Sequence, residues 1–188
     1  MKEEIENRPP LMSIADMEKF FKSMPHLSSI PQVLYCAVEN PAPLAGMPMH
    51  YSPQKDFWTG LADAGFRHVV NLAADSCAEY DPAPLKMLYA MELEDMSSGT
   101  PPRNWEREEL LIRQAVDAIM PKLGNGEGVV VHCIGGRGRS GTVIGCVLKR
   151  LGYPAGEIMK YLNDLQIARS KSGWPESEWQ GKLVRAFK

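Results

Sequence analysis

The chain lacks an excess of charge of either sign: its 188 residues carry 21 Lys and Arg against 23 Asp and Glu, a formal net charge of -2. Without a broad basic field, it has no general means of holding nucleic acid or an anionic membrane through counterion release. Any anion that the protein recognises must therefore bind at a local site.

Long apolar runs and paired cysteine motifs are also missing. The uncharged stretch from Leu27 to Val38 is far shorter than the ~20 apolar residues that a membrane-spanning helix needs. The first ten residues contain three Glu and no apolar segment, unlike a signal peptide. The four cysteines form no Cys-x-x-Cys pair, and no histidine pair stands at zinc spacing, which is typical of free thiols in a reducing compartment. We expect a cytoplasmic protein with no stable membrane insertion.

Short apolar runs alternate with amphipathic segments along the chain. The apolar runs predict strands at residues 33–38, 68–73, 87–91 and 128–132. Helical spacing predicts helices at residues 13–23, 52–65, 101–124, 140–151, 156–169 and 175–187. This alternation indicates an α/β fold with a central, mostly parallel sheet of four to five strands and helices on both faces.

Three further expectations concern the arrangement of these elements. The segment 128–132 is the most β-branched and should lie at the centre of the sheet. Residues 40–51 contain three prolines and a glycine and should form a loop. Residues 1–30 are expected to form an N-terminal arm with a short helix, and residues 31–188 a single domain.

A glycine-rich turn follows the central strand. Three glycines in four positions, 135–138, allow backbone N–H groups to turn inward, and the N-terminus of the next helix adds its partial positive charge. Such a cradle suits a tetrahedral oxyanion, and Arg139 can add a bidentate guanidinium contact. Cys133 lies at the base of the cradle, where these groups should stabilise a thiolate at neutral pH. A thiolate beneath an oxyanion site is a nucleophile directed at phosphorus.

Two other phosphate-binding patterns partly match this turn. Residues 136–141 satisfy Gly-x-Gly-x-x-Gly, but a dinucleotide fold needs a second strand ending in an acidic residue about 20 residues later. Ile158, Leu162 and Leu165 instead recur at helical spacing in that region. An ATPase loop needs a lysine where this chain has Arg139. The sequence therefore argues against both patterns.

The pattern His-Cys-x5-Arg-Ser-Gly-Thr at residues 132–142 resembles the signature of the cysteine-dependent protein tyrosine phosphatases, specifically their compact dual-specificity-like branch. The likeness covers about residues 33–188, and the cysteine loop is its most specific part. Asp95, 38 residues before Cys133 and followed by Pro101-Pro102, resembles the family's general acid. Asp75 and Asp81 are the reserve candidates for this role.

The resemblance implies a role for each residue of the turn. Cys133 would attack the phosphorus atom, Asp95 would protonate the leaving group, and neither a metal nor a cofactor would be required. Ser140 would donate a hydrogen bond to the sulfur, and His132 would orient the loop. The predicted phosphate-binding residues are Ile134, Gly135, Gly136, Arg137, Gly138 and Arg139.

The expected substrates are phosphotyrosine, phosphoserine and phosphothreonine in proteins, and the enzyme is expected to be a monomer. Arg137 resembles a basic residue of the phosphoinositide-selective members, so phosphoinositides and inositol phosphates are an alternative. A second alternative is a non-catalytic phosphate-binding module, which would need neither Cys133 nor Asp95. Cys77 follows a strand at the same edge of the sheet, and oxidation could join it to Cys133 in a disulfide.

Overall fold

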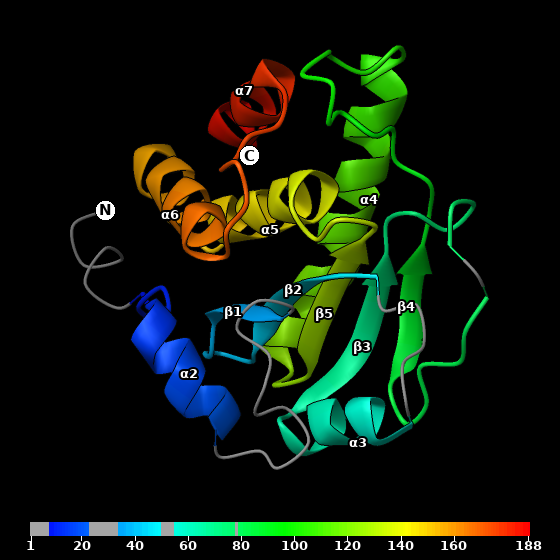
Figure 1. Cartoon of the computed structure of the whole chain (residues 1–188), viewed down its shortest axis with the longest axis vertical. Helices are drawn as coiled ribbons and strands as arrows, with labels where there is room; N and C mark the ends of the chain where they lie inside the picture. The colour runs from blue at the N-terminus through cyan, green and yellow to red at the C-terminus, as the bar shows by residue number, and fades with distance from the viewer. Residues whose placement is uncertain (1–7, 23–33, 50–54, 78) are drawn as a thin grey trace.

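The structure is a computed structural model that describes residues 8–22, 34–49, 55–77 and 79–188. The strands are β1 (Tyr35–Val38), β2 (Leu44–Pro48), β3 (Phe66–Asn71), β4 (Lys86–Ala90) and β5 (Gly128–Cys133). The helices are α2 (Ile14–Lys22), α3 (Lys55–Asp63), α4 (Trp105–Gly124), α5 (Gly138–Arg150), α6 (Ala155–Ala168) and α7 (Glu178–Ala186). Figure 1 shows one central sheet with helices around it, which confirms the predicted α/β class.

The five strands form one sheet in the order β1-β2-β5-β3-β4. Only the β1–β2 pair is antiparallel, and the other three pairs are parallel. Every residue of β5 is buried, as expected for a β-branched strand with neighbours on both sides. The prediction that this strand lies at the centre of the sheet is confirmed.

The prediction of a loop over residues 40–51 is wrong, because β2 lies within this range and pairs with both β1 and β5. The three prolines do not break the ladder: Pro41 and Pro43 precede the strand and Pro48 is its last residue. Position 46 requires a glycine because the ring of Tyr35 packs directly against it: a Cβ there would lie 2.2 Å from the Cζ of Tyr35. Residues 50 and 51 lie outside the described residues.

Helices cover both faces of the sheet. A Cβ on Gly46 would also meet Ile144 of α5, and Gly46 pairs with Val131, so that side of β5 faces α5. The next residue, His132, points to the opposite face. There it contacts Tyr80, whose ring stacks on Trp58 of α3. Figure 1 shows α4, α6 and α7 grouped around α5.

Residues 8–22 contact the rest of the protein. The backbone N–H of Met12 donates to the carbonyl of Ala37 in β1, and Met17 and Phe21 on one face of α2 are buried. The described part of the predicted arm therefore covers the β1 edge of the sheet. Within the described residues, no helix combines the length and apolar character needed to cross a membrane.

Candidate active site

The glycine-rich loop (residues 134–139) runs from the end of β5 into the first turn of α5. Cys133 is the last residue of β5 and is only 2% exposed, and the backbone N–H of Gly136 donates to its Sγ at 3.2 Å. Gly136 has a φ of +64°, and a Cβ there would lie 2.3 Å from the backbone N of Pro48. Any side chain at this position would therefore collide with the backbone at the end of β2 and displace the loop.

Arg139 lies in the first turn of α5 and is 5% exposed. Its Nη1 donates to Glu92 Oε1 and to the carbonyl of Leu93, both at 3.2 Å, and its Nη2 donates to Asp95 Oδ2 at 3.0 Å. The guanidinium thus joins the glycine-rich loop to the loop after β4, more than 40 residues earlier in the chain. The structure brings Cys133, Arg139 and Asp95 together at the carboxyl edge of the sheet.

Glu92 and Glu94, the acidic neighbours of Asp95, both hold backbone groups in place. Glu92 Oε2 accepts hydrogen bonds from the N–H groups of Asp75 and Ser76, which fixes the turn after β3. Glu94 accepts from the N–H groups of residues 103 and 104 at the start of α4. The side chain of Asp95, by contrast, is half-exposed, with 53% of its surface accessible to solvent. Asp81, a reserve candidate for the general acid, accepts a hydrogen bond from the N–H of Ala83 in its own turn.

The environment of Asp95 favours its ionised form. Partial burial raises the pKa of this carboxyl, but the hydrogen bonds from Ser97 and the charges of Arg139 and Arg137 lower the pKa more. The net pKa lies below the ordinary value of an aspartic acid. Asp95 is therefore a carboxylate paired with Arg139.

His132 is held by an aromatic cluster that the sequence did not reveal. Its Nε2 lies 2.5 Å from the Oη of Tyr80, whose ring stacks on Trp58 at 5.7 Å. Burial lowers the pKa of His132 to about 4, although the backbone of Cys133 acts in the opposite direction. Burial raises the pKa of Tyr80, so the phenol stays protonated and shares a hydrogen bond with Nε2. The lowered pKa of His132 makes its imidazole neutral at pH 7.

Two predicted interactions of Cys133 remain predictions. The hydroxyl of Ser140 is buried and has no hydrogen-bond partner among the described residues, so its bond to the sulfur is not formed in this arrangement. Cys77 is partly exposed, with its Sγ 3.9 Å from Asn71 Oδ1. Burial and the nearby Glu92 carboxylate raise the pKa of Cys77, which disfavours its spontaneous ionisation. Cys77 and Cys133 are both free thiols here, and the disulfide that oxidation could form between them stays a prediction.

The segment between α6 and α7 supports the glycine-rich loop from outside. Arg169, at the end of α6, donates to the carbonyl of Gly136 at 3.2 Å, and Trp174 Nε1 donates to the carbonyl of Gly138 at 3.3 Å. Sequence reasoning missed Arg169, because no short motif spans the 33 residues between it and Gly136.

Replacing Arg169 with methionine should loosen the glycine-rich loop. The substitution leaves the carbonyl of Gly136 buried without this donor, which typically costs about 1–3 kcal/mol. We expect a lower free energy of unfolding in urea and weaker binding of inorganic phosphate measured by calorimetry. An Arg169→Lys variant retains the charge and one donor and should lose less. Unchanged phosphate affinity in the methionine variant would contradict this supporting role.

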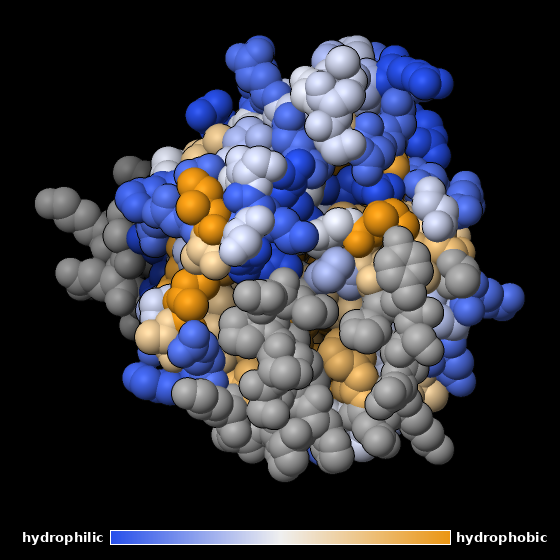
Figure 2. Space-filling model, viewed as in Figure 1, coloured by the Kyte–Doolittle hydropathy of each residue, from blue (hydrophilic) through white to orange (hydrophobic). Residues whose placement is uncertain are grey.

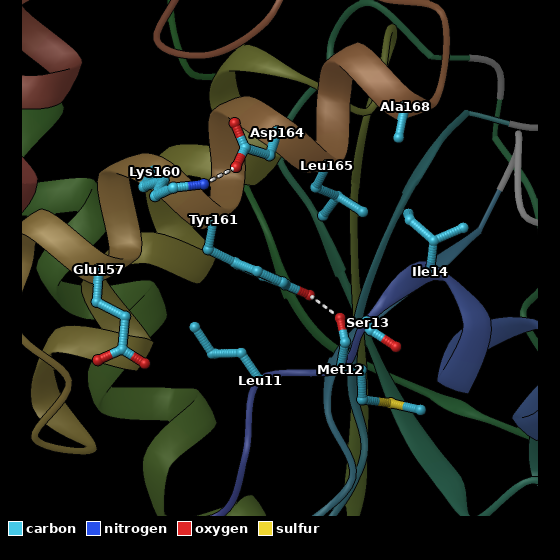
Figure 3. Close-up of a pocket in the computed structure, with 10 residues that line it drawn as sticks. All are labelled: Leu11, Met12, Ser13, Ile14, Glu157, Lys160, Tyr161, Asp164, Leu165 and Ala168. Carbon is cyan, nitrogen blue, oxygen red and sulfur yellow. Dashed lines mark hydrogen bonds and ion pairs between the residues drawn. The ribbon is translucent and has the colours of Figure 1, made fainter.

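A separate cavity of about 450 Å³ lies between residues 11–14 and α6. Figure 3 shows Leu11, Ile14 and Leu165 around an apolar interior, with the Lys160–Asp164 ion pair on one side. None of the predicted site residues lines it. The cavity therefore plays no part in the site at the glycine-rich loop.

The chain matches known proteins over this region. A family model described as "Polymorphic toxin system, DSP-PTPase phosphatase" matches residues 45–153, more than half of the chain. Among solved structures, Tk-PTP in its active form is 23% identical with a TM-score of 0.54, and the match covers 77% of this chain and 90% of that one. PTPMT1 in complex with PI(5)P is 18% identical, with a TM-score of 0.55 and coverages of 77% and 88%.

A third similar structure is the human tyrosine phosphatase-like serine/threonine/tyrosine-interacting protein. It is 16% identical with a TM-score of 0.56, and the match covers 76% of this chain and 88% of that one. At these identities the three structures show a shared fold.

Proposed function

Because the chain belongs to the DSP-PTPase phosphatase family of polymorphic toxin systems, we propose that it hydrolyses phosphomonoesters through a cysteinyl-phosphate intermediate. The observation that carries this proposal is the convergence of three side chains. Cys133 lies under the N–H of Gly136, and Arg139 contacts Asp95 beside the same loop. A nucleophile, an anion-binding guanidinium and a proton donor are the groups that such a reaction needs.

The proposed reaction has two steps. In the first, the thiolate of Cys133 attacks phosphorus in line, a sulfur–phosphorus bond forms, and the bond to the ester oxygen breaks as Asp95 gives that oxygen its proton. In the second, water attacks the same phosphorus, the Asp95 carboxylate takes the proton, and the sulfur leaves as thiolate. The N–H groups of residues 134–139 and the Arg139 guanidinium hold the three equatorial oxygens throughout.

Substrate binding would also prepare Asp95 for its role. Arg139 is bonded to the carboxylates of Glu92 and Asp95, so an incoming phosphate must take over at least part of this guanidinium. Once Arg139 turns to the phosphate, its charge, which adds to the hydrogen bonds from Ser97 in lowering the pKa of Asp95, is neutralised. The pKa of Asp95 then rises, which favours the protonated acid that the first step requires.

Phosphotyrosine, phosphoserine and phosphothreonine in proteins are the substrates that we propose. The surface over α7 is hydrophilic and the surface over the loop before α4 is of intermediate hydropathy, as Figure 2 shows, which suits a polar peptide. The second candidate is a phosphatase for phosphoinositides or inositol phosphates that uses the same mechanism. Two arginines in one loop, Arg137 and Arg139, favour it, and PTPMT1, which has the same fold, is described with PI(5)P bound.

The test is release of phosphate from p-nitrophenyl phosphate, from phosphotyrosyl and phosphoseryl peptides, and from inositol phosphates, with EDTA present. We expect turnover that resists EDTA, inhibition by vanadate, and a phosphorylated Cys133 peptide in acid-quenched samples analysed by mass spectrometry. No phosphate release from any of these compounds would favour the non-catalytic module. Release without a phosphorylated Cys133 would contradict the proposed intermediate.

A further inference from the structure

Arg137 stands in the glycine-rich loop two residues before Arg139, and the resemblance suggests that it faces the substrate. In the structure its guanidinium turns toward the segment between α6 and α7. Both Nε and Nη2 lie 2.6 Å from Glu176 Oε1, and Nη1 donates to the hydroxyl of Ser172. The side chains of Arg137 and Glu176 are only 18% and 11% exposed. The pair is therefore shielded from water and from salt.

Several neighbours hold Glu176 in this position. Its backbone N–H donates to Gln180 Oε1 at 2.8 Å, which anchors it to the start of α7. A Cβ on Gly138 would lie 1.6 Å from Glu176 Oε2, so the absence of a side chain at Gly138 creates the space that the carboxylate fills. Trp174, two residues before Glu176, is bonded to the carbonyl of Gly138. The carboxylate thus rests against the loop itself.

The carboxylate of Glu176, held against the loop, changes the charge that a bound substrate meets. A substrate with several phosphate groups would place one on Arg139 and needs further cations for the others. Arg137 is the neighbouring cation in the loop, but it is already bonded twice to Glu176. A second phosphate would have to displace this carboxylate or lie beside it, and like charges at short range repel each other. A substrate with a single phosphate meets no such obstacle.

We propose that Glu176 is a specificity-determining residue, which withholds Arg137 from polyphosphorylated substrates and restricts the site to esters that present one phosphate group. This inference rests on the proposed phosphatase function and distinguishes between its two candidate substrate classes.

The test is the Glu176→Gln variant, which removes the negative charge and keeps the size of the side chain. The probes are myo-inositol hexakisphosphate and p-nitrophenyl phosphate, compared by the ratio of their kcat/KM values. We expect the ratio to rise by about tenfold, the scale of one charged hydrogen bond, mainly through a lower KM for the hexakisphosphate. In the double variant Arg137→Ala/Glu176→Gln the rise should disappear, because the released cation is gone.

Glu178→Gln is the matched control. Glu178 lies two residues away on α7, is exposed, and pairs with Lys182. This variant makes the same change in net charge without touching Arg137, so the ratio should stay at the wild-type value. An equal rise in both glutamine variants would point to a general charge effect and overturn the proposal.

Other outcomes separate this inference from the proposed function. If p-nitrophenyl phosphate is hydrolysed and Glu176→Gln leaves the ratio unchanged or lowers both rates equally, Glu176 is a structural residue and the inference fails alone. If the wild-type protein hydrolyses neither compound, the proposed function fails. In that case calorimetric binding of the hexakisphosphate decides the inference, with a Kd about tenfold lower in Glu176→Gln supporting it and an equal Kd overturning it.

Discussion

Replacing Cys133 with serine should abolish turnover and leave the protein able to bind phosphate or vanadate. A serine hydroxyl is not ionised at neutral pH and cannot replace the thiolate as a nucleophile. Removal of a covalent nucleophile lowers kcat by a factor on the order of 10⁴ to 10⁶. The anion-binding groups should survive, because the N–H groups belong to the backbone and Arg139 is held by Glu92, Leu93 and Asp95.

Two measurements check this expectation. Steady-state hydrolysis of p-nitrophenyl phosphate gives the loss in kcat, and isothermal calorimetry gives the Kd for inorganic phosphate. Cys77→Ser, assayed in reducing buffer, is the matched control, because Cys77 is a partly exposed thiol on the turn after β3. It should keep wild-type turnover. Equal rates for Cys133→Ser and the wild-type protein would disprove the nucleophile assignment.

The features that could be predicted from the sequence are those encoded within one short segment. The β-branched run before the glycines predicts a buried strand, and β5 lies at the centre of the sheet. The loop that follows is local in sequence, so Cys133, Arg139 and the glycines between them could be named together. β2 was missed because its prolines resemble those of a loop, and only their positions at the ends of the strand make them compatible with pairing.

The features that could not be predicted depend on contacts between distant segments. Glu92, Glu94 and Asp95 are three acids within four positions, and nothing in their spacing tells that Glu92 and Asp95 contact Arg139 while Glu94 holds the backbone before α4. Tyr80 is 52 residues from His132, and Glu176 is 39 residues from Arg137. A sequence pattern shows only that a side chain such as Arg137 is present. Whether its charge is free to bind a substrate or is already paired depends on contacts that only the folded chain makes.

Replacing Asp95 with asparagine should slow the reaction in a way that depends on the leaving group. Asparagine cannot donate the proton, and general acid catalysis typically contributes 10²–10⁴-fold. A phosphoserine peptide, whose alkoxide is a poor leaving group, should lose the full factor in kcat/KM. p-Nitrophenyl phosphate should lose much less, because its leaving anion is stable without a proton. Equal losses for both substrates would contradict the assignment of Asp95 as the acid.

The pH dependence gives a second test of the same residue. Since the hydrogen bonds from Ser97 and the charge of Arg139 hold the pKa of Asp95 below its ordinary value, its protonated fraction in the free enzyme is small at neutral pH. The kcat/KM of the wild-type enzyme for the phosphoserine peptide should therefore increase as the pH falls from about 7 toward 5. The Asp95→Asn profile should lack this increase. Glu94→Gln, a change at a neighbouring acid that is bonded to backbone N–H groups, should retain it.

Because Asp95 is paired with Arg139, we expect Asp95→Asn to lower kcat and at the same time to strengthen the binding of phosphate. In the resting protein the carboxylate of Asp95 competes with phosphate for Nη2 of Arg139. Asparagine carries no charge and competes less, so Asp95→Asn should bind inorganic phosphate more tightly, by up to about fivefold for a half-exposed pair. If Asp95→Asn is slower and yet binds phosphate more tightly, the side chain of Asp95 serves both as the proton donor and as the partner of Arg139 before phosphate binds. Weaker phosphate binding in Asp95→Asn would instead show that the carboxylate supports the site and does not compete for it.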